Sequence, residues 1–168
     1  MVRECEIGRR KMRLTAFSDV SLRIMILLSG AKGEQLSTHY IAQGVGTPYN
    51  HVAKSVAYLA NQGWVVATRG RTGGVVLSAS GKKVTVGEVL RKTEGDTPMV
   101  ECESDNEDCP LNSSCRLRGY LARAREAFFE VLDPVVISEL PTEQQMGPVF
   151  VELGMGPRSR SRKLAGAS

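Results

Sequence analysis

The stretch Gly44-Val45-Gly46-Thr47-Pro48-Tyr49 decides the fold predicted for this chain. Its glycines predict a tight turn. Threonine before proline predicts a helix start, with Thr47 as N-cap and Pro48 as first helical residue, because proline lacks only an amide that would be unpaired there. That helix is expected over residues 48–61. Together with a short helix expected over residues 39–43, it predicts a helix-turn-helix.

The helix expected over residues 48–61 has one apolar and one polar side. Val52, Val56 and Leu59 recur at i, i+4 and i+7, which places them toward a core. The other side chains can donate and accept hydrogen bonds in a major groove and contact phosphates. An ordinary solvated helix face is the alternative for each of them. The candidate DNA-contacting residues at this helix are Thr47, Tyr49, Asn50, His51, Lys54, Ser55 and Tyr58.

Two apolar segments, residues 64–68 and 75–78, follow the helix and predict the strands of a β-hairpin. The glycine-rich turn between them carries Arg69 and Arg71, which can grip phosphate or enter a minor groove. A hairpin in this position is a wing. Lys82, just beyond it, is a further candidate phosphate contact, with plain solvation as the alternative.

Two helices are expected to flank this unit. The first is expected over residues 20–29, with Ser18 or Asp19 as N-cap. Thr85 and Glu88 form a capping-box pattern that opens the second, which ends near Gly95. The predicted fold class is therefore mainly α with a small β-hairpin (α+β), a winged helix-turn-helix.

Three of the four cysteines fall within fourteen residues, as Cys102, Cys109 and Cys115 with spacing C-x6-C-x5-C. Acidic residues surround them, so buried structural thiols are disfavoured, because free cysteine normally packs as a small hydrophobe. A disulfide pair would suit a secreted chain, but residues 1–11 are charged and do not resemble a secretory signal. Structural zinc usually uses paired cysteines and four ligands. Three widely spaced thiolates favour an iron-sulfur cluster, with zinc as the alternative.

Charge is unevenly distributed along the chain. Residues 12–92 hold ten Lys or Arg against three Asp or Glu, whereas residues 93–112 hold seven acidic residues and no basic one. The basic segment indicates a polyanionic partner, with the acidic cysteine loop kept apart from it. No apolar run approaches the roughly 20 residues of a membrane span, and a cytoplasmic protein without membrane contact is expected. Two histidines and no nucleophile-base pair argue against an enzyme.

The longest helix is expected after the cysteine loop, beginning at Ser113 or Ser114. Its apolar residues recur at spacings of four and three, which predicts a heptad seam for a second copy, with packing on its own domain as the alternative. The seam residues are Leu117, Leu121, Ala124, Phe128 and Val131. The expected organisation is a disordered extension (1–11), a winged helix-turn-helix domain (12–83), a connecting helix (84–95), a cysteine cluster-binding loop (96–115), a dimerisation helix with a short terminal turn (116–140), and a disordered tail (141–168).

Residues 12–19, the Pro48-Tyr49 helix, the arginine wing, the three-cysteine loop and the long helix together resemble the IscR/NsrR group of bacterial iron-sulfur winged-helix regulators. The similarity covers about residues 12–140. Within the group the chain is most similar to the NsrR branch of nitric-oxide-sensing repressors. IscR-like proteins place a histidine ligand where this chain has Arg118, which cannot bind iron.

The resemblance implies a homodimer on palindromic double-stranded operator DNA, released when nitric oxide attacks the cluster. It implies that Cys102, Cys109 and Cys115 of one subunit hold the cluster, with Asp19 of the partner subunit as fourth ligand. Asp19 as a simple helix cap is the alternative. A four-iron (4Fe-4S) cluster is favoured, with a two-iron (2Fe-2S) cluster as the alternative. The first cysteine spacing is one residue longer than is usual in the group. A zinc-stabilised, redox-sensing or iron-sensing winged-helix regulator without a nitric-oxide role is the competing function.

Overall fold

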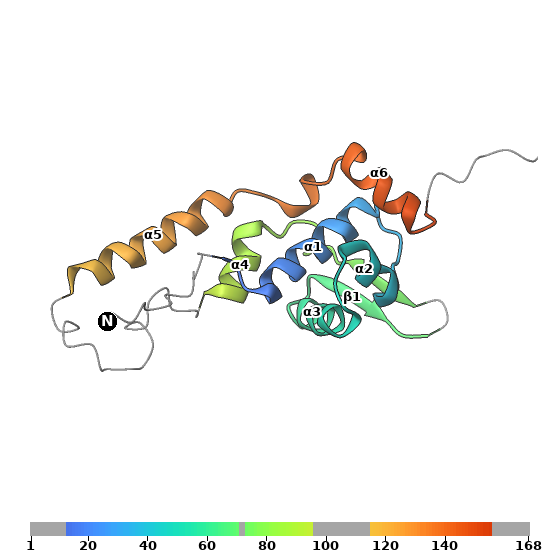
Figure 1. Ribbon diagram of the computed structural model, residues 1–168, viewed down its shortest axis with the longest axis horizontal. Helices are drawn as coiled ribbons and strands as arrows, with labels where there is room; N and C mark the ends of the chain where they lie inside the picture. Colours follow the sequence, from blue (N-terminus) through green and yellow to red (C-terminus); the bar gives the residue numbers. More distant parts are fainter. Residues whose placement is uncertain (1–12, 71–72, 96–114, 156–168) are drawn as a thin grey trace, which may run out of the picture.

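The computed structural model describes residues 13–70, 73–95 and 115–155 (Figure 1). The expected extension (1–11) with Cys5, the loop cysteines Cys102 and Cys109, and residues 156–168 of the expected disordered tail lie outside these residues. The described part is mainly α with one two-stranded antiparallel sheet, which confirms the predicted fold class. Its elements are α1 (Ala16–Gly30), α2 (Thr38–Val45), α3 (Tyr49–Asn61), β1 (Val65–Thr68), β2 (Gly74–Leu77), α4 (Val86–Glu94), α5 (Arg116–Leu132), a 3-10 turn η3 (Ile137–Glu139) and α6 (Glu143–Glu152).

Helix α1 is the central helix of the winged-helix head. It begins four residues earlier than expected, and its N-cap is Thr15, whose side chain accepts a hydrogen bond from the Ser18 amide at 3.2 Å. Ser18 and Asp19 are therefore inside the first turn, and the expectation that either caps the helix is wrong. Ile24 is fully buried at 0% exposure, and burying such a side chain stabilises a fold by about 1.5–3 kcal/mol.

Helices α2 and α3 pack against α1 and against each other as a helix-turn-helix. Ser37 caps α2 by accepting from the Tyr40 amide at 3.2 Å. Gly46 ends α2 in the left-handed region (φ 63°), a conformation that glycine adopts without steric cost. Val52 and Leu59 of α3 are both 0% exposed, as their spacing predicts.

Strands β1 and β2 pair with Val65 opposite Leu77 and Thr68 opposite Gly74. The wing is also attached to the segment before α2, because Leu36 and Val75 exchange two backbone hydrogen bonds of 3.0 and 2.8 Å. The pairing between Leu36 and Val75 therefore holds the wing beside the helix-turn-helix.

Helix α4 begins with the predicted capping box, in which the Thr85 and Glu88 side chains each accept from the other residue's backbone amide. Figure 1 shows α5 extending away from the head. Phe129 is the one α5 residue classed as buried, whereas Leu117 is 62% and Val131 is 71% exposed. Helix α5 begins at Arg116, two or three residues later than expected.

The chain after α5 returns to the head. The short terminal turn expected after the dimerisation helix buries Ile137, at 0% exposure, in the core of the head. The backbone amide of Ile137 donates to the Val84 carbonyl at 3.1 Å. This segment therefore completes the core of the head.

The expectation of a disordered tail is wrong for residues 143–152, which form α6. Thr142 caps the helix by accepting from the Gln145 amide at 3.2 Å. Met146 is 7% exposed, and a Cβ on Gly30 of α1 would lie 3.0 Å from its side chain. The glycine and proline content suggested disorder, but apolar residues spaced at i, i+3, i+4 and i+7 from Met146 give α6 a face that packs on α1.

Candidate nucleic-acid interface and cluster ligands

The N-cap of α3 is one residue later than predicted. Pro48 is the N-cap, with φ −54° and ψ 139°, and makes no side-chain cap hydrogen bond. Thr47 lies one residue earlier, half-buried, and its hydroxyl is 3.4 Å from the Val45 carbonyl oxygen, to which it donates. Thr47 as the helix cap is therefore wrong, although its position at the α2–α3 turn leaves it a candidate contact.

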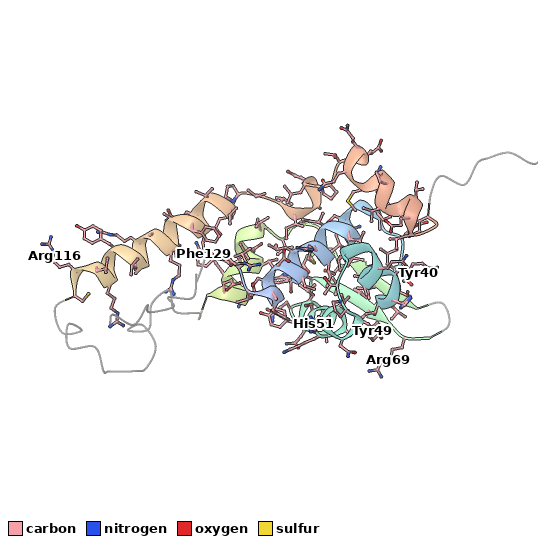
Figure 2. The ribbon with its side chains drawn as sticks, viewed as in Figure 1. Tyr40, Tyr49, His51, Arg69, Arg116 and Phe129 are labelled. Carbon is pink, nitrogen blue, oxygen red and sulfur yellow. The ribbon has the colours of Figure 1, made fainter. Side chains whose placement is uncertain are left out.

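The N-terminal half of α3 presents an exposed polar face. Tyr49 is 53% exposed, and Asn50, His51 and Lys54 are exposed as well. Figure 2 shows Tyr49, His51 and Arg69 on the same side of the molecule. The helix and the wing therefore present aromatic, amide, imidazole and cationic groups on one face, a combination suited to base edges and phosphates.

Ser55 does not belong to that face. It is 1% exposed, because position 55 lies three residues after Val52 and so turns toward the core. The prediction that Ser55 contacts DNA is wrong. The Tyr58 hydroxyl donates to the Lys92 carbonyl at 2.9 Å, and its ring packs edge-on against Phe17 at 5.1 Å between ring centres. Tyr58 therefore positions α3 against α1 and α4.

Arg69 is exposed immediately after β1, at the start of the wing turn. Gly70 has φ +112°, a conformation that L side chains rarely adopt. A Cβ on Gly73 would collide with the Thr68 carbonyl oxygen, so position 73 has room only for glycine. Arg71 lies outside the described residues.

Lys82 is exposed in the turn after β2, and its carbonyl oxygen accepts from the Ser138 hydroxyl at 2.7 Å. Its backbone is thereby fixed to the segment after α5, while its ammonium group is in solvent. Tyr40, a large aromatic residue on α2 that is 46% exposed, is not among the residues that the sequence pattern predicts to contact DNA.

Of the candidate cluster ligands, Cys115 and Asp19 are within the described residues, and Cys102 and Cys109 are not. Cys115 is a half-buried free thiol at the N-cap of α5. Backbone amides at a helix start favour negative charge, which suits a thiolate ligand. No three His, Cys, Asp or Glu residues come together in a metal-binding group within residues 13–70, 73–95 and 115–155.

The Asp19 carboxylate forms an ion pair with Arg23 one turn later, with 2.7 Å between Nη2 and Oδ2. Its side chain is 46% exposed, so a second copy can reach it. The Ser18 hydroxyl donates to the Thr93 hydroxyl at 2.8 Å, which joins the first turn of α1 to the last turn of α4. Asp19 therefore lies near the point where the chain leaves α4 for the cysteine loop. Cys115 offers a thiol of the kind that holds iron-sulfur clusters, and Asp19 offers a half-exposed carboxylate.

The fold and the exposed α3 face define a winged helix-turn-helix transcription regulator with a long appended helix. A family profile described as "Iron-dependent Transcriptional regulator" matches residues 14–143, and the chain belongs to this family, Rrf2. No helix of the described part is long and apolar enough to cross a membrane.

The chain is similar to curated transcription regulators over most of its length. It is 43% identical over 144 residues to the HTH-type transcriptional repressor NsrR of Streptomyces coelicolor, covering 84% of this chain and 96% of the relative. It is 36% identical over 131 residues to NsrR of Bacillus subtilis, covering 77% and 90%. These relatives are transcription regulators rather than enzymes, in agreement with the sequence.

Solved structures agree on the fold. IscR of T. potens superposes with a TM-score of 0.60 at 19% identity, covering 79% of this chain and 88% of that one. CymR of B. subtilis, entitled the global cysteine regulator, superposes with a TM-score of 0.57 at 28% identity, covering 77% and 96%. The winged-helix architecture is therefore shared across regulators whose titles differ.

Proposed function

We propose that this chain is a homodimeric iron-sulfur transcription repressor that senses nitric oxide in the cytoplasm. In this proposal the cluster-loaded dimer binds a palindromic operator in double-stranded DNA, and nitrosylation of the cluster releases it. The similarity that carries the proposal is the 43% identity to a named NsrR repressor across nearly its whole length. The three-cysteine motif supports it independently, because closely grouped thiolates can hold an iron-sulfur cluster, and the family resemblance adds Asp19 as the fourth ligand.

Cys102, Cys109 and Cys115 are the proposed thiolate ligands, and Asp19 of the second copy is the proposed oxygen ligand. When bound, a four-iron cluster supplies iron that nitric oxide can attack. Cys115 is positioned for this role because it directly precedes α5, so a change at its sulfur acts on the start of that helix. Asp19 is an exposed carboxylate, and an oxygen ligand holds iron less firmly than a thiolate does.

The proposed DNA interface is the exposed face of α3 together with the wing. Tyr49, Asn50 and His51 are the proposed base-edge contacts, and Lys54, Arg69 and Lys82 are proposed to neutralise phosphates. A palindromic operator needs two such heads with recognition helices about 34 Å apart. The exposed apolar residues of α5, Leu117 and Val131, are proposed to pair the two copies.

The decisive experiment combines cluster content with operator binding in anaerobically purified protein. A brown protein with visible absorption, several iron atoms per chain and operator binding that weakens on nitric-oxide titration supports the proposal. Cys115→Ser should lose both iron and operator binding. The matched control is Cys5→Ser, which lies outside the loop and should retain both. Iron content and binding unchanged in Cys115→Ser would refute the cluster assignment.

Metal analysis and operator binding of the same protein also distinguish the proposed nitric-oxide sensor from the competing functions. A colourless protein with one zinc per chain would support a zinc-stabilised regulator. An iron-sulfur protein whose operator binding responds to oxidants or iron supply, but not to nitric oxide, would support a redox or iron sensor. The structural likeness to CymR, at 28% identity, is the observation that keeps a different signal in consideration.

A further inference from the structure

The junction between α4 and α5 fixes one end of the long helix to the head. The Val86 amide donates to the Val135 carbonyl at 2.8 Å, and the Ile137 amide donates to the Val84 carbonyl at 3.1 Å. A Cβ on Gly87 would collide with the Asp133 carboxylate and lie 2.7 Å from its backbone nitrogen. These contacts hold the C-terminal end of α5 directly on the first turn of α4.

Contacts at one end do not by themselves fix the direction of a helix. Helix α5 has 17 residues, and at about 1.5 Å per residue it extends roughly 25 Å from the junction. A rotation of about 10° at the junction would displace its far end by about 4 Å. Cys115 lies at that far end. The direction of α5 therefore determines where the cysteine loop ends relative to the head.

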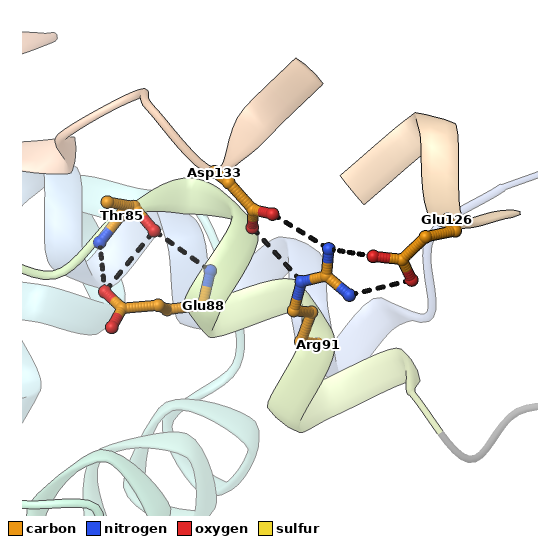
Figure 3. A network of polar contacts seen from close by, with 5 residues as sticks. All are labelled: Thr85, Glu88, Arg91, Glu126 and Asp133. Atoms are coloured by element: carbon orange, nitrogen blue, oxygen red, sulfur yellow. Dashed lines mark hydrogen bonds and ion pairs between the residues drawn. The ribbon is translucent and has the colours of Figure 1, made fainter. Parts of the chain in front are cut away.

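Arg91 of α4 provides a second point of attachment (Figure 3). Its Nε and Nη2 donate to the two Asp133 carboxylate oxygens at 3.1 and 2.8 Å. Its Nη1 and Nη2 donate to the two Glu126 oxygens at 2.9 and 2.6 Å. Its guanidinium carbon lies 4.9 Å from the centre of the Phe129 ring. One planar cation thus holds two carboxylates that are seven residues, or two turns, apart on one face of α5.

Hydrogen bonding to Arg91 lowers the pKa of both Glu126 and Asp133, and the same bonds raise the pKa of Arg91. All three groups are therefore charged at neutral pH. The side chains are 34%, 53% and 39% exposed, in the order Arg91, Glu126 and Asp133, and water screens ion pairs of this kind. Such a network contributes little to stability. Its distinctive property is geometric. Arg91 makes two hydrogen bonds to each carboxylate, and such bidentate contacts fix both the position and the direction of α5.

We propose that Arg91 is a positioning residue that fixes the direction of α5 relative to the winged-helix head through Glu126, and so transmits the state of the cysteine loop to the spacing of the two recognition helices. This inference rests on the proposed dimeric cluster function. Asp133 belongs to the junction, whereas Glu126 lies two turns nearer to the cysteine loop. The Arg91–Glu126 contact is therefore the part of the network that resists pivoting about the junction.

The test uses the full-length dimer and an operator selected from a random-sequence DNA pool by the cluster-loaded protein. Operator affinity is measured with and without cluster for the unaltered protein, Glu126→Gln and Arg91→Lys. Glu126→Gln keeps the side-chain size and leaves the Asp133 pair intact, while lysine cannot bridge two carboxylates bidentately. An allosteric coupling typically changes affinity by about 5- to 150-fold. We expect that ratio in the unaltered protein and a ratio below about threefold in both variants.

A second readout separates positioning from simple destabilisation. Inserting one base pair between the half-sites moves them apart by about 3.4 Å and rotates one about the DNA axis. The unaltered cluster-loaded dimer should discriminate strongly against that operator, and the two variants should discriminate less at equal iron content. Lys32→Gln is the matched control, because it breaks the 2.9 Å ion pair to Glu143 of α6 without touching α5. It should behave as the unaltered protein does.

The outcomes distinguish the two proposals. Equal affinity with and without cluster in the unaltered protein would refute the cluster-controlled function, and the inference with it. A large ratio in the unaltered protein that persists in Glu126→Gln and Arg91→Lys, with unchanged spacing discrimination, would overturn the role of Arg91 alone. If one variant does not fold, the other decides the result, because each removes the bridge from a different helix.

Discussion

Helix α1 of the winged-helix head buries seven of its fifteen residues, whereas α5 buries one of its seventeen. Both helices carry apolar residues at helical spacing, so pattern alone does not separate them. The difference is in what covers the pattern. The head supplies α2, α3, α4 and α6 around α1, while Leu117 and Val131 of α5 are left largely exposed by the rest of the chain.

The elements of the head bury the apolar face of α1, whereas the large apolar side chains of the outer part of α5 are left exposed. Large exposed apolar side chains on one helix are typical of an interaction surface. Under the proposed function that surface is a second copy of α5.

The largest expected effect is in the head. Leu59→Ala removes a side chain that is 0% exposed, and it should lower the free energy of unfolding by about 2–5 kcal/mol. Leu117→Ala, at a residue 62% exposed, should change it by less than about 0.5 kcal/mol when the protein is dilute enough to be monomeric. Urea unfolding across a range of protein concentrations checks both values.

The dependence of these two values on protein concentration tests whether a second copy covers α5. If a second copy covers Leu117, the cost of Leu117→Ala should grow as the protein concentration rises, because association stabilises the folded chain by mass action. The cost of Leu59→Ala should change much less. A Leu117→Ala cost that stays near zero at all concentrations would argue against a dimer through α5.

The next largest effects are expected from two glycine-to-alanine substitutions, which should change the free energy of unfolding in opposite directions. Gly87→Ala forces a Cβ into Asp133 at the α4–α5 junction, and overpacking of this kind costs about 1–3 kcal/mol. Gly119→Ala lies in α5 with nothing within 4 Å of the added Cβ, and alanine should stabilise that helix by about 0.5–1 kcal/mol. Thermal unfolding of the two variants under one condition measures the difference. Equal shifts would show that the junction is not tightly packed in solution.

A smaller effect is expected in the salt dependence of DNA binding. Lys54→Gln removes one proposed phosphate contact, so the slope of log affinity against log salt concentration should fall in magnitude by about 1. Lys32→Gln removes a lysine paired with Glu143 of α6 and should leave the slope unchanged. Fluorescence anisotropy at four or five salt concentrations gives both slopes. Identical slopes for the two variants would place the DNA on a different face.

Periodicity and capping residues predicted the head well, since Thr85 and Glu88 form the expected capping box and Val52 and Leu59 are fully buried. The N-cap of a helix is harder to predict where several residues could serve as the cap. Three hydroxyl or carboxyl residues precede the core of α1, and sequence cannot show that Thr15 rather than Ser18 or Asp19 accepts the first-turn amide.

Contacts between distant segments were not predictable from local patterns. The polarity of Ser55 predicts a place on the DNA face, but its burial follows from the packing of α3 on the rest of the head. The glycine and proline of residues 143–152 predict a disordered tail, whereas the order of these residues comes from their packing on α1. Arg91 gave no signal, because its two carboxylate partners lie 35 and 42 residues away.

The smallest expected effect is the pH dependence of the Arg91 network. Glu126 and Asp133 have lowered pKa values in the folded chain, so their pairing with Arg91 contributes stability above the unfolded pKa values of about 4. That contribution is lost as pH falls through the lowered folded values. The difference in melting temperature between the unaltered protein and Arg91→Met should therefore be constant from about pH 7 to 5 and shrink below about pH 4. Lys32→Met is the control: hydrogen bonding to Lys32 also lowers the pKa of Glu143, but that pair is far more exposed and should give a weaker trend of the same sign. A difference that stayed constant below about pH 4 would mean that Arg91 stabilises the chain through its packing on Phe129 rather than through the two carboxylates, because neither arginine nor phenylalanine titrates there.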